Sequence, residues 1–244
     1  MQRSAPRLTR ILACAAVPVM LVVAGCSSDS DGKSEAKPES SASTAATGTA
    51  PEATPSEKPV EPAKYTKLPE PCKAISAKTI EELVPDVKDK AGTPGKSSDV
   101  TSRGSCSWNG LEDKGVDGSQ YRWLDISVLR YDSEQSLGSG EKRAQDSYAK
   151  EVAKVKASEG ATQVKTSPAK GVGQDATAIA YGLKKTGEDF RYAAIVTRAE
   201  NTVITVSFNG AGYAGADTPA SSELMEGTVK ATKEAVAAVA AANK

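Results

Sequence analysis

The chain has 244 residues, with 31 basic and 31 acidic side chains, so its formal net charge at pH 7 is zero. It contains no histidine, which removes the usual general base and the commonest zinc ligand. These two facts exclude Ser-His-Asp and Cys-His hydrolytic sites, HExxH metal sites, and the basic excess of a nucleic-acid-binding protein. No cofactor and no metal site are predicted.

The N-terminal segment has three arginines among its first ten residues and then an apolar run over 11–25. This pattern is typical of a secretory signal peptide. The run is about fifteen residues long, whereas a helix that spans a bilayer needs roughly twenty. It ends in Val-Ala-Gly before Cys26, which resembles the bacterial lipobox. That resemblance implies cleavage before Cys26 and acylation of its thiol. The alternatives are an ordinary cleaved signal with a chance cysteine, or an uncleaved anchor.

Residues 1–25 are therefore predicted as the signal peptide, and the mature protein as lipid-anchored on the outer face of the cell membrane. Residues 26–67 consist mainly of Ser, Thr, Ala, Pro, Glu and Lys. Such a segment buries too little apolar surface to offset its chain entropy. We predict a disordered tether over 26–67 and a single folded domain over 68–244.

A chemical state is predicted for each of the four cysteines. Cys14 leaves with the signal and Cys26 is acylated, so Cys72 and Cys106 remain in an oxidising compartment. A disulfide between them is predicted. It would close a loop of about 35 residues and stabilise the domain by roughly 3–4 kcal/mol. A metal site made of two cysteines without histidine is disfavoured.

The first half of the domain begins with a short helix capped by Ser76, in which Ile75 and Ile80 are spaced as a hydrophobic staple. Pro85 ends the helix, and 86–102 reads as loop. A short strand over 105–108 is expected to turn at Asn109-Gly110. The clearest strand covers 121–131, where apolar and mixed side chains alternate.

The second half is predicted to start with a helix over roughly 140–157. Three strands follow, around 177–181, 190–196 and 204–208, and then a glycine-rich loop over 209–217. The final helix carries an apolar stripe of Met225, Val229, Thr232, Val236 and Val239. The order α-β-β-α-β-β-β-α with short connections predicts an α+β fold, an antiparallel sheet of about five strands flanked by helices.

Three features together resemble a known family. They are a Pro-Cys pair at 71–72 before a helix, Cys-Ser-Trp at 106–108, and Gly-Val-Gly-Gln-Asp-Ala at 171–176 before a strand. The chain resembles the actinobacterial lipoproteins grouped as DUF3558, a resemblance that covers about 68–242. It implies architecture and location but no activity. A likeness to helix-flanked sheets of the PsbP/Mog1 type is a fold analogy only.

Two motif matches are not interpreted as functional. Ser-Tyr-Ala-Lys at 147–150 and Lys-Thr-Gly at 185–187 evoke penicillin-binding proteins, but no S-x-N lies between them and they are too close together. The segment 171–176 also matches a dinucleotide-binding string. It precedes a strand instead of a helix, so a turn is the simpler interpretation.

The second face of the 121–131 strand carries Tyr121, Trp123, Asp125, Leu129 and Tyr131. One interpretation is that helices cover both faces of the sheet. The other is an aromatic-lined groove for a ligand or partner, which Tyr213 in the glycine-rich loop could close.

Three functions stay open at this point. The leading hypothesis is a non-catalytic binding or sensing module for a small apolar ligand, a wall component or an envelope protein. The second is a wall-glycan enzyme that uses carboxylates alone, with Asp125 as its acid. The third is a structural envelope lipoprotein without a ligand.

Overall fold

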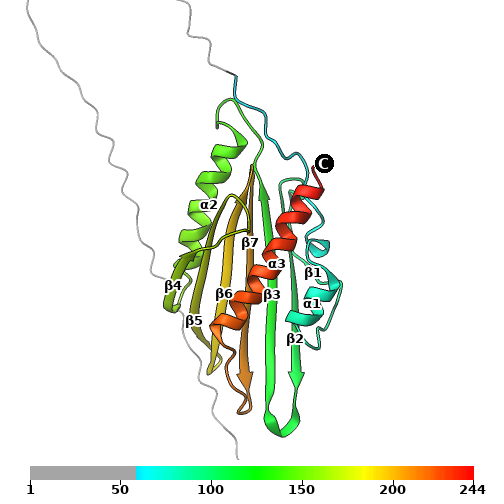
Figure 1. Cartoon of the computed structure of the whole chain (residues 1–244), viewed down its shortest axis with the longest axis vertical. Coiled ribbons are helices and arrows are strands. Elements are labelled where there is room, and N and C mark those ends of the chain that lie inside the picture. Colours follow the sequence, from blue (N-terminus) through cyan, green and yellow to red (C-terminus); the bar gives the residue numbers. More distant parts are fainter. Residues whose placement is uncertain (1–58) are drawn as a thin grey trace, which may run out of the picture. The chain divides into compact units, whose positions relative to one another are not determined.

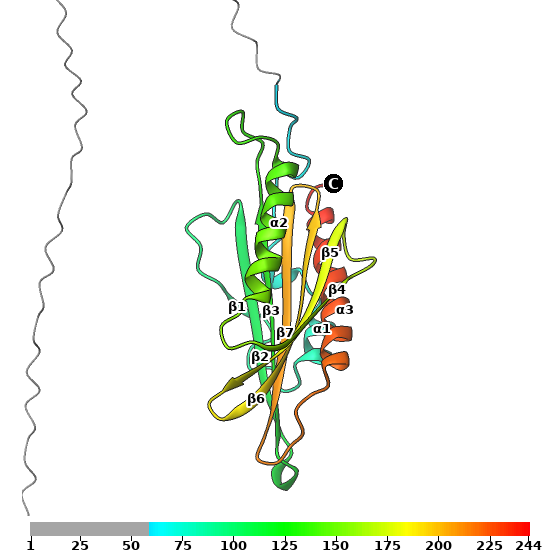
Figure 2. The ribbon, with the colours of Figure 1, turned by 90° about the vertical axis from the view of Figure 1, so that its left-hand side faces the viewer.

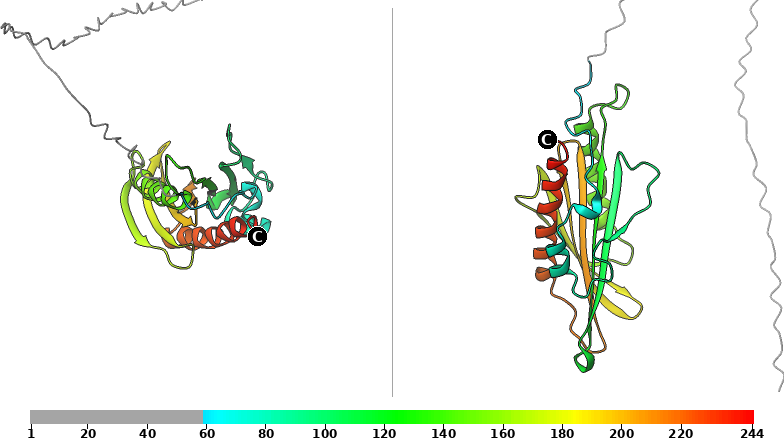
Figure 3. Two further views of the ribbon diagram at one scale, coloured as in Figure 1. Left: turned by 90° about the horizontal axis from the view of Figure 1, so that it is seen from above. Right: turned by 90° about the vertical axis from the view of Figure 1, so that its right-hand side faces the viewer.

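The structure is a computed structural model and describes residues 59–244 (Figure 1). One antiparallel sheet has the strand order β1-β2-β3-β7-β6-β5-β4. The helices α2 and α3 lie on opposite faces of this sheet (Figure 3). The elements in chain order are β1–β7 and α1–α3 with two 3-10 turns: η1 Pro71–Lys73, α1 Ala77–Leu83, β1 Thr93–Pro94, β2 Arg103–Asp113, η2 Gly115–Asp117, β3 Ser119–Arg130, α2 Gly140–Lys156, β4 Thr162–Pro168, β5 Asp175–Lys185, β6 Glu188–Ala199, β7 Thr202–Tyr213, α3 Ser221–Ala241.

The predicted α+β class and antiparallel sheet are confirmed, but the sheet has seven strands instead of about five. The two unpredicted strands are β1 and β4. Every residue of β4 is exposed, so no apolar alternation marks it in the sequence. β1 is only two residues long, and it forms because Thr93 and Pro94 pair with Ser107 and Cys106 of β2.

The sheet face toward α3 holds the main core. Leu124, Ile126 and Val128 of β3 are fully buried there, as the alternation predicted. The predicted α3 stripe is confirmed in part, since Thr232 and Val239 are fully buried and Met225 and Val236 pack against the core. The buried side also includes small residues that the prediction left out, namely Gly227, Ala231 and Ala235. A Cβ added at Gly227 would lie 2.7 Å from Leu83 and 3.0 Å from Phe208, so glycine sets how closely α3 approaches.

One predicted turn is wrong, and one predicted loop begins too early. β2 runs straight through Asn109-Gly110 and pairs with β3 as far as Asp113. Gly110 instead allows a close approach of backbone, since a Cβ there would collide with the carbonyl oxygen of Pro85. The predicted loop over 209–217 is also too long, because β7 continues to Tyr213 through its pairing with β3.

The opposite face is only partly covered. The predicted stripe of α2 (Ala144, Tyr148, Val152 and Val155) packs against β5, β6 and β7 as expected. Figure 2 shows that α2 lies over one half of this face, while the strands extend well beyond the C-terminal end of the helix. The half of the sheet beyond α2 is where side chains of this face can meet solvent.

The N-terminal part of the domain is attached by a cap and a disulfide. Ser76 caps α1 by accepting a hydrogen bond from the Thr79 amide at 3.3 Å, and Ile75 and Ile80 are both buried. Cys72 and Cys106 form the predicted disulfide, with their Cα atoms 5.1 Å apart. The bond joins η1 to the N-terminal half of β2.

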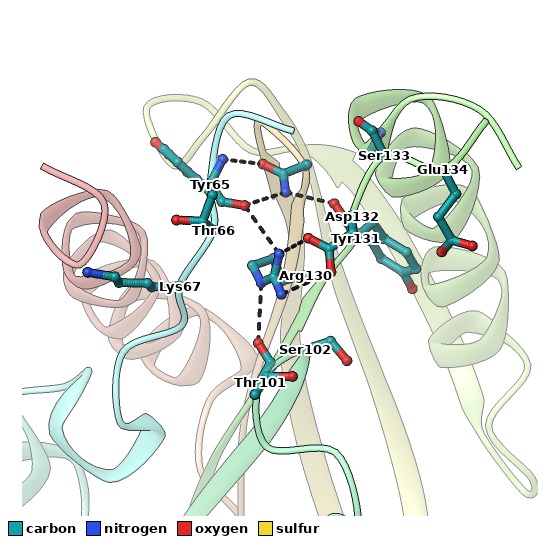
Figure 4. Close-up of polar contacts among 12 residues, drawn as sticks. Tyr65, Thr66, Lys67, Thr101, Ser102, Arg130, Tyr131, Asp132, Ser133 and Glu134 are labelled. Atoms are coloured by element: carbon teal, nitrogen blue, oxygen red, sulfur yellow. Dashed lines mark hydrogen bonds and ion pairs between the residues drawn. The ribbon is translucent and has the colours of Figure 1, made fainter. Parts of the chain in front are cut away.

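Residues 59–67 fall within the predicted tether, and in the structure they lie against the domain. Asn201 accepts a hydrogen bond from the Tyr65 amide at 2.8 Å, and its own amide donates to the carbonyl oxygens of Tyr65 and Tyr131. Arg130 donates to the carbonyl oxygens of Tyr65 and Thr101 and pairs with the Asp132 carboxylate (Figure 4). The ordered contacts of the domain therefore begin before Leu68.

Candidate functional site

Aromatic side chains gather on the sheet face beyond α2. A cavity of about 570 Å³ is lined there by Tyr121, Trp123, Phe190, Tyr192 and Tyr213, together with polar residues. The Tyr121 ring makes edge contacts with Phe190 and Tyr213, with centroids 6.0 and 6.4 Å apart. These rings come from β3, β6 and β7, so the order of the strands brings them together.

A second group of side chains fixes the orientation of the rings. Tyr181 and Tyr192 are stacked with centroids 4.8 Å apart. The Lys185 ammonium donates to the Tyr192 hydroxyl at 2.7 Å and lies 5.2 Å from the centre of that ring. Lysine and tyrosine thus hold one end of the cavity in place at the β5–β6 hairpin.

Asp125 is a lining residue of three cavities. It lines the aromatic cavity, a second cavity of about 490 Å³ beside α2, and a third of about 370 Å³ beside β1. We call these three adjoining cavities the groove. Each has the volume of a small-molecule site, and neighbouring cavities share lining residues: Ser207 lines the first two, and Trp123 lines the aromatic cavity and the one beside β1.

Burial raises the pKa of the Asp125 carboxyl from its ordinary value of 3.8 to about 6. Hydrogen bonds with the side chains of Ser207 and Trp123 favour the charged form and offset part of that rise. The carboxyl therefore changes its charge near pH 6.

The four aromatic residues proposed from the sequence separate into two groups. Tyr121, Trp123 and Tyr213 meet in the aromatic cavity. Tyr131 lies ten residues along the strand from Tyr121, roughly 33 Å away, so the two cannot contact one small ligand. Tyr131 lines the cavity beside α2, and its hydroxyl bonds the Ser147 hydroxyl of α2 at 2.5 Å.

The sequence did not mark Phe190, Tyr192 or Lys185 as site residues, although their strands were predicted. The aromatic alternation of 190–192 was a usable signal, but it could not show that β6 and β3 both flank β7. Ser147 bonds Tyr131, and Thr186-Gly187 forms the β5–β6 turn.

A larger cavity of about 680 Å³ lies on the α3 face, between α1, α3 and the β2–β3 hairpin. Six of its charged side chains form ion pairs with one another: Arg122–Glu223, Lys230–Glu82 and Lys114–Glu112. We give the groove priority, because it combines half-buried rings with polar side chains that face the same open space.

Cys26, the predicted acylation site, lies outside the described residues, as does the signal peptide. Within 59–244, none of the helices combines the length and the hydropathy that a bilayer crossing requires. Over the same residues, no group of three or more cysteine, aspartate or glutamate side chains is placed to hold a metal ion.

The raised pKa of Asp125 predicts how stability depends on pH. The folded state favours the neutral carboxyl, so Asp125 does not lower the free energy of unfolding below pH 4. Between pH 4 and about pH 6 it lowers that free energy progressively, and above pH 6 the loss of stability stays constant. Asp125→Asn is expected to stabilise the domain at pH 7 by on the order of 1–3 kcal/mol and to have little effect at pH 4. Urea unfolding at the two pH values measures this. Asp189→Asn, at an exposed carboxylate, is the control and should show no such difference; an equal effect of Asp125→Asn at both pH values would contradict the assignment.

Comparison with known proteins gives a family and one distant structure. The family model described as "Protein of unknown function (DUF3558)" matches residues 21–188. No curated protein matches the chain. The solved structure described as "Crystal structure of LpqN involved in cell envelope biogenesis of Mycobacterium tuberculosis" is 15% identical, covers 58% of this chain and 85% of that chain, and has a TM-score of 0.30. A likeness this distant carries no argument about the fold or function of this chain.

Proposed function

The chain belongs to the DUF3558 family, which has no known function, and from that premise we propose that it is a lipid-anchored envelope protein that binds a ligand in the groove without catalysing a reaction. The predicted signal peptide and the lipobox-like sequence before Cys26 support export and acylation of that cysteine. The tether supports presentation of the domain beyond the membrane. A PsbP/Mog1-like fold is part of the same proposal, since helices lie on both faces of one antiparallel sheet.

One observation carries the binding proposal: α2 leaves uncovered a sheet face that is rich in half-buried aromatic residues. Tyr121, Trp123 and Tyr213 keep part of their surface accessible, although neighbouring helices bury the equivalent positions of the opposite face. Rings that serve only as core are covered by an element of the same chain. Exposed rings beside polar groups are typical of a binding site.

The test is whether the protein, purified from the cells that export it, still has a ligand bound. We would export residues 26–244 with Cys26→Ser from an ordinary cleavable signal, so that no detergent is needed, and record native mass spectra. The expected result is an added mass on the wild-type domain and on the control Val116→Ala, which changes a fully exposed turn residue. Trp123→Ala should lower the occupancy at least tenfold. A bare mass for every form would instead favour a structural lipoprotein without a ligand.

A second function is favoured by one observation in the cavity beside α2. Asp125 on β3 and Glu151 on α2 both line it, and glycan-cleaving enzymes use two carboxyl groups. Glu151 is engaged in an ion pair with Lys154 at 3.2 Å, which favours the binding proposal over this one. Release of reducing ends from wall glycan by the wild type, lost in both Asp125→Asn and Glu151→Gln, would establish the enzyme instead.

A further inference from the structure

The floor of the groove is a grid of polar side chains set by strand register. Ser107, Asp125 and Ser207 are paired across β2, β3 and β7, and the next row is Ser105, Ser127 and Thr205. The row on the other side is Asn109, Trp123 and Asn209. With ordinary strand and residue spacings, the three rows cover about 10 Å by 13 Å. A ligand on this floor meets hydrogen-bonding groups along its whole length.

An aliphatic ligand is a poor match for such a floor. Eight of the nine grid residues line the three cavities, and six of these carry an uncharged hydroxyl or amide group: Ser105, Ser107, Ser127, Thr205, Ser207 and Asn209. An alkyl chain would remove water from these hydroxyl and amide groups and offer no hydrogen bond in return, which costs free energy at each one. The ligand must therefore bring its own donors and acceptors.

The charges that line the groove suit an uncharged ligand better than a strongly ionic one. Its acids are Asp125 and Glu151, and its bases are Arg103, Lys154 and Lys185. Lys154 is paired with Glu151, and Lys185 contacts the Tyr192 hydroxyl. No cluster of cations is left to neutralise a phosphate, and no cluster of acids to hold a polyamine.

The aromatic end supplies flat apolar surfaces next to these polar groups. Trp123 lies in both the aromatic cavity and the cavity beside β1, next to Asp125 in each. A pyranose ring has the matching surface, with C–H bonds on one face and hydroxyls around its rim. Resting on the proposed function, we infer that the groove binds an uncharged carbohydrate chain, with a sugar ring stacked on Trp123 and its hydroxyls bonded to the polar grid.

The experiment titrates residues 26–244 carrying Cys26→Ser with two probes in a calorimeter. The first is an uncharged tetrasaccharide of N-acetylglucosamine and the second is 1-octanol. The inference expects saturable binding of the tetrasaccharide and at least tenfold weaker binding of octanol. Trp123→Ala should weaken the sugar affinity at least tenfold, about 1.4 kcal/mol. Trp123→Phe should restore part of it, and Val116→Ala should change nothing. Tyr213→Ala replaces Trp123→Ala if the latter does not fold.

The outcomes separate the ligand class from the proposed function. Octanol binding that depends on Trp123, without sugar binding, overturns the carbohydrate and leaves the groove as a binding site. If neither probe binds, the composition of the ligand that the purified protein retains from the envelope tests the inference. Sugar in that ligand supports the carbohydrate, and a retained ligand without sugar overturns it. Failure of both probes together with a bare native mass overturns the carbohydrate and the binding function alike.

Discussion

Replacing both Cys72 and Cys106 by alanine is expected to destabilise the domain by roughly 3–4 kcal/mol. The disulfide closes a loop with a sequence separation of 34 and so restricts the unfolded chain. It also fastens η1 to β2, beside the 2-residue strand β1. Cys106 is only 1% exposed, so its truncation adds the loss of buried contacts. Urea unfolding without reductant measures the change.

Chemical reduction provides the matched control, because it opens the same bond without changing a side chain. Reduced wild-type protein should lose most of the stability that the double variant loses. A midpoint shift equivalent to less than about 0.5 kcal/mol in both would show that the loop contributes little, contrary to the chain-entropy account. Mass mapping under non-reducing conditions should join the two cysteines in the native protein.

Cys26→Ser is expected to abolish incorporation of labelled palmitate and to release the protein from the membrane or leave its signal uncut. Two or more acyl chains hold a protein stably, at about 0.8 kcal/mol for each buried methylene, so their loss changes membrane attachment by orders of magnitude. The measurement is the labelled fraction and the division of protein between membrane pellet and supernatant.

Cys14→Ser is the matched control, since it also removes a thiol but lies within the predicted signal. It should leave both labelling and membrane attachment unchanged. Label that persists in the Cys26→Ser protein, or a wild-type protein that never incorporates palmitate, would contradict the lipid anchor and with it the proposed location.

The fold was predictable where one strand or helix carries its own pattern. The alternation over 121–131 identified β3 and its buried face, and Ser76 marked the start of α1. β4 was missed because an exposed edge strand needs no apolar alternation. The stripe of α3 was predicted only in part, because large side chains were weighted over small buried residues such as Gly227 and Ala231.

Only the site residues that lie on one strand, β3, were predictable from the sequence. Tyr121 and Trp123 were identified from β3, but their neighbours Phe190 and Tyr192 depend on the pairing of β7 with both β3 and β6. Asn209 was assigned to a loop, yet it lies in β7 opposite Trp123. Pairing between distant strands depends on the whole fold, and no local pattern records it.

The most direct test of the groove uses the two tryptophans of the chain, which give two indole N–H signals in a ¹⁵N spectrum. Trp123 lies in the groove, whereas Trp108 is 1% exposed in the core on the α3 side. Trp123→Phe assigns the signals. Between protein loaded with the ligand from its envelope and protein stripped of it, the Trp123 signal should shift and the Trp108 signal should stay in place. A shift of Trp108 alone, or of neither signal at full occupancy, would contradict binding in the groove.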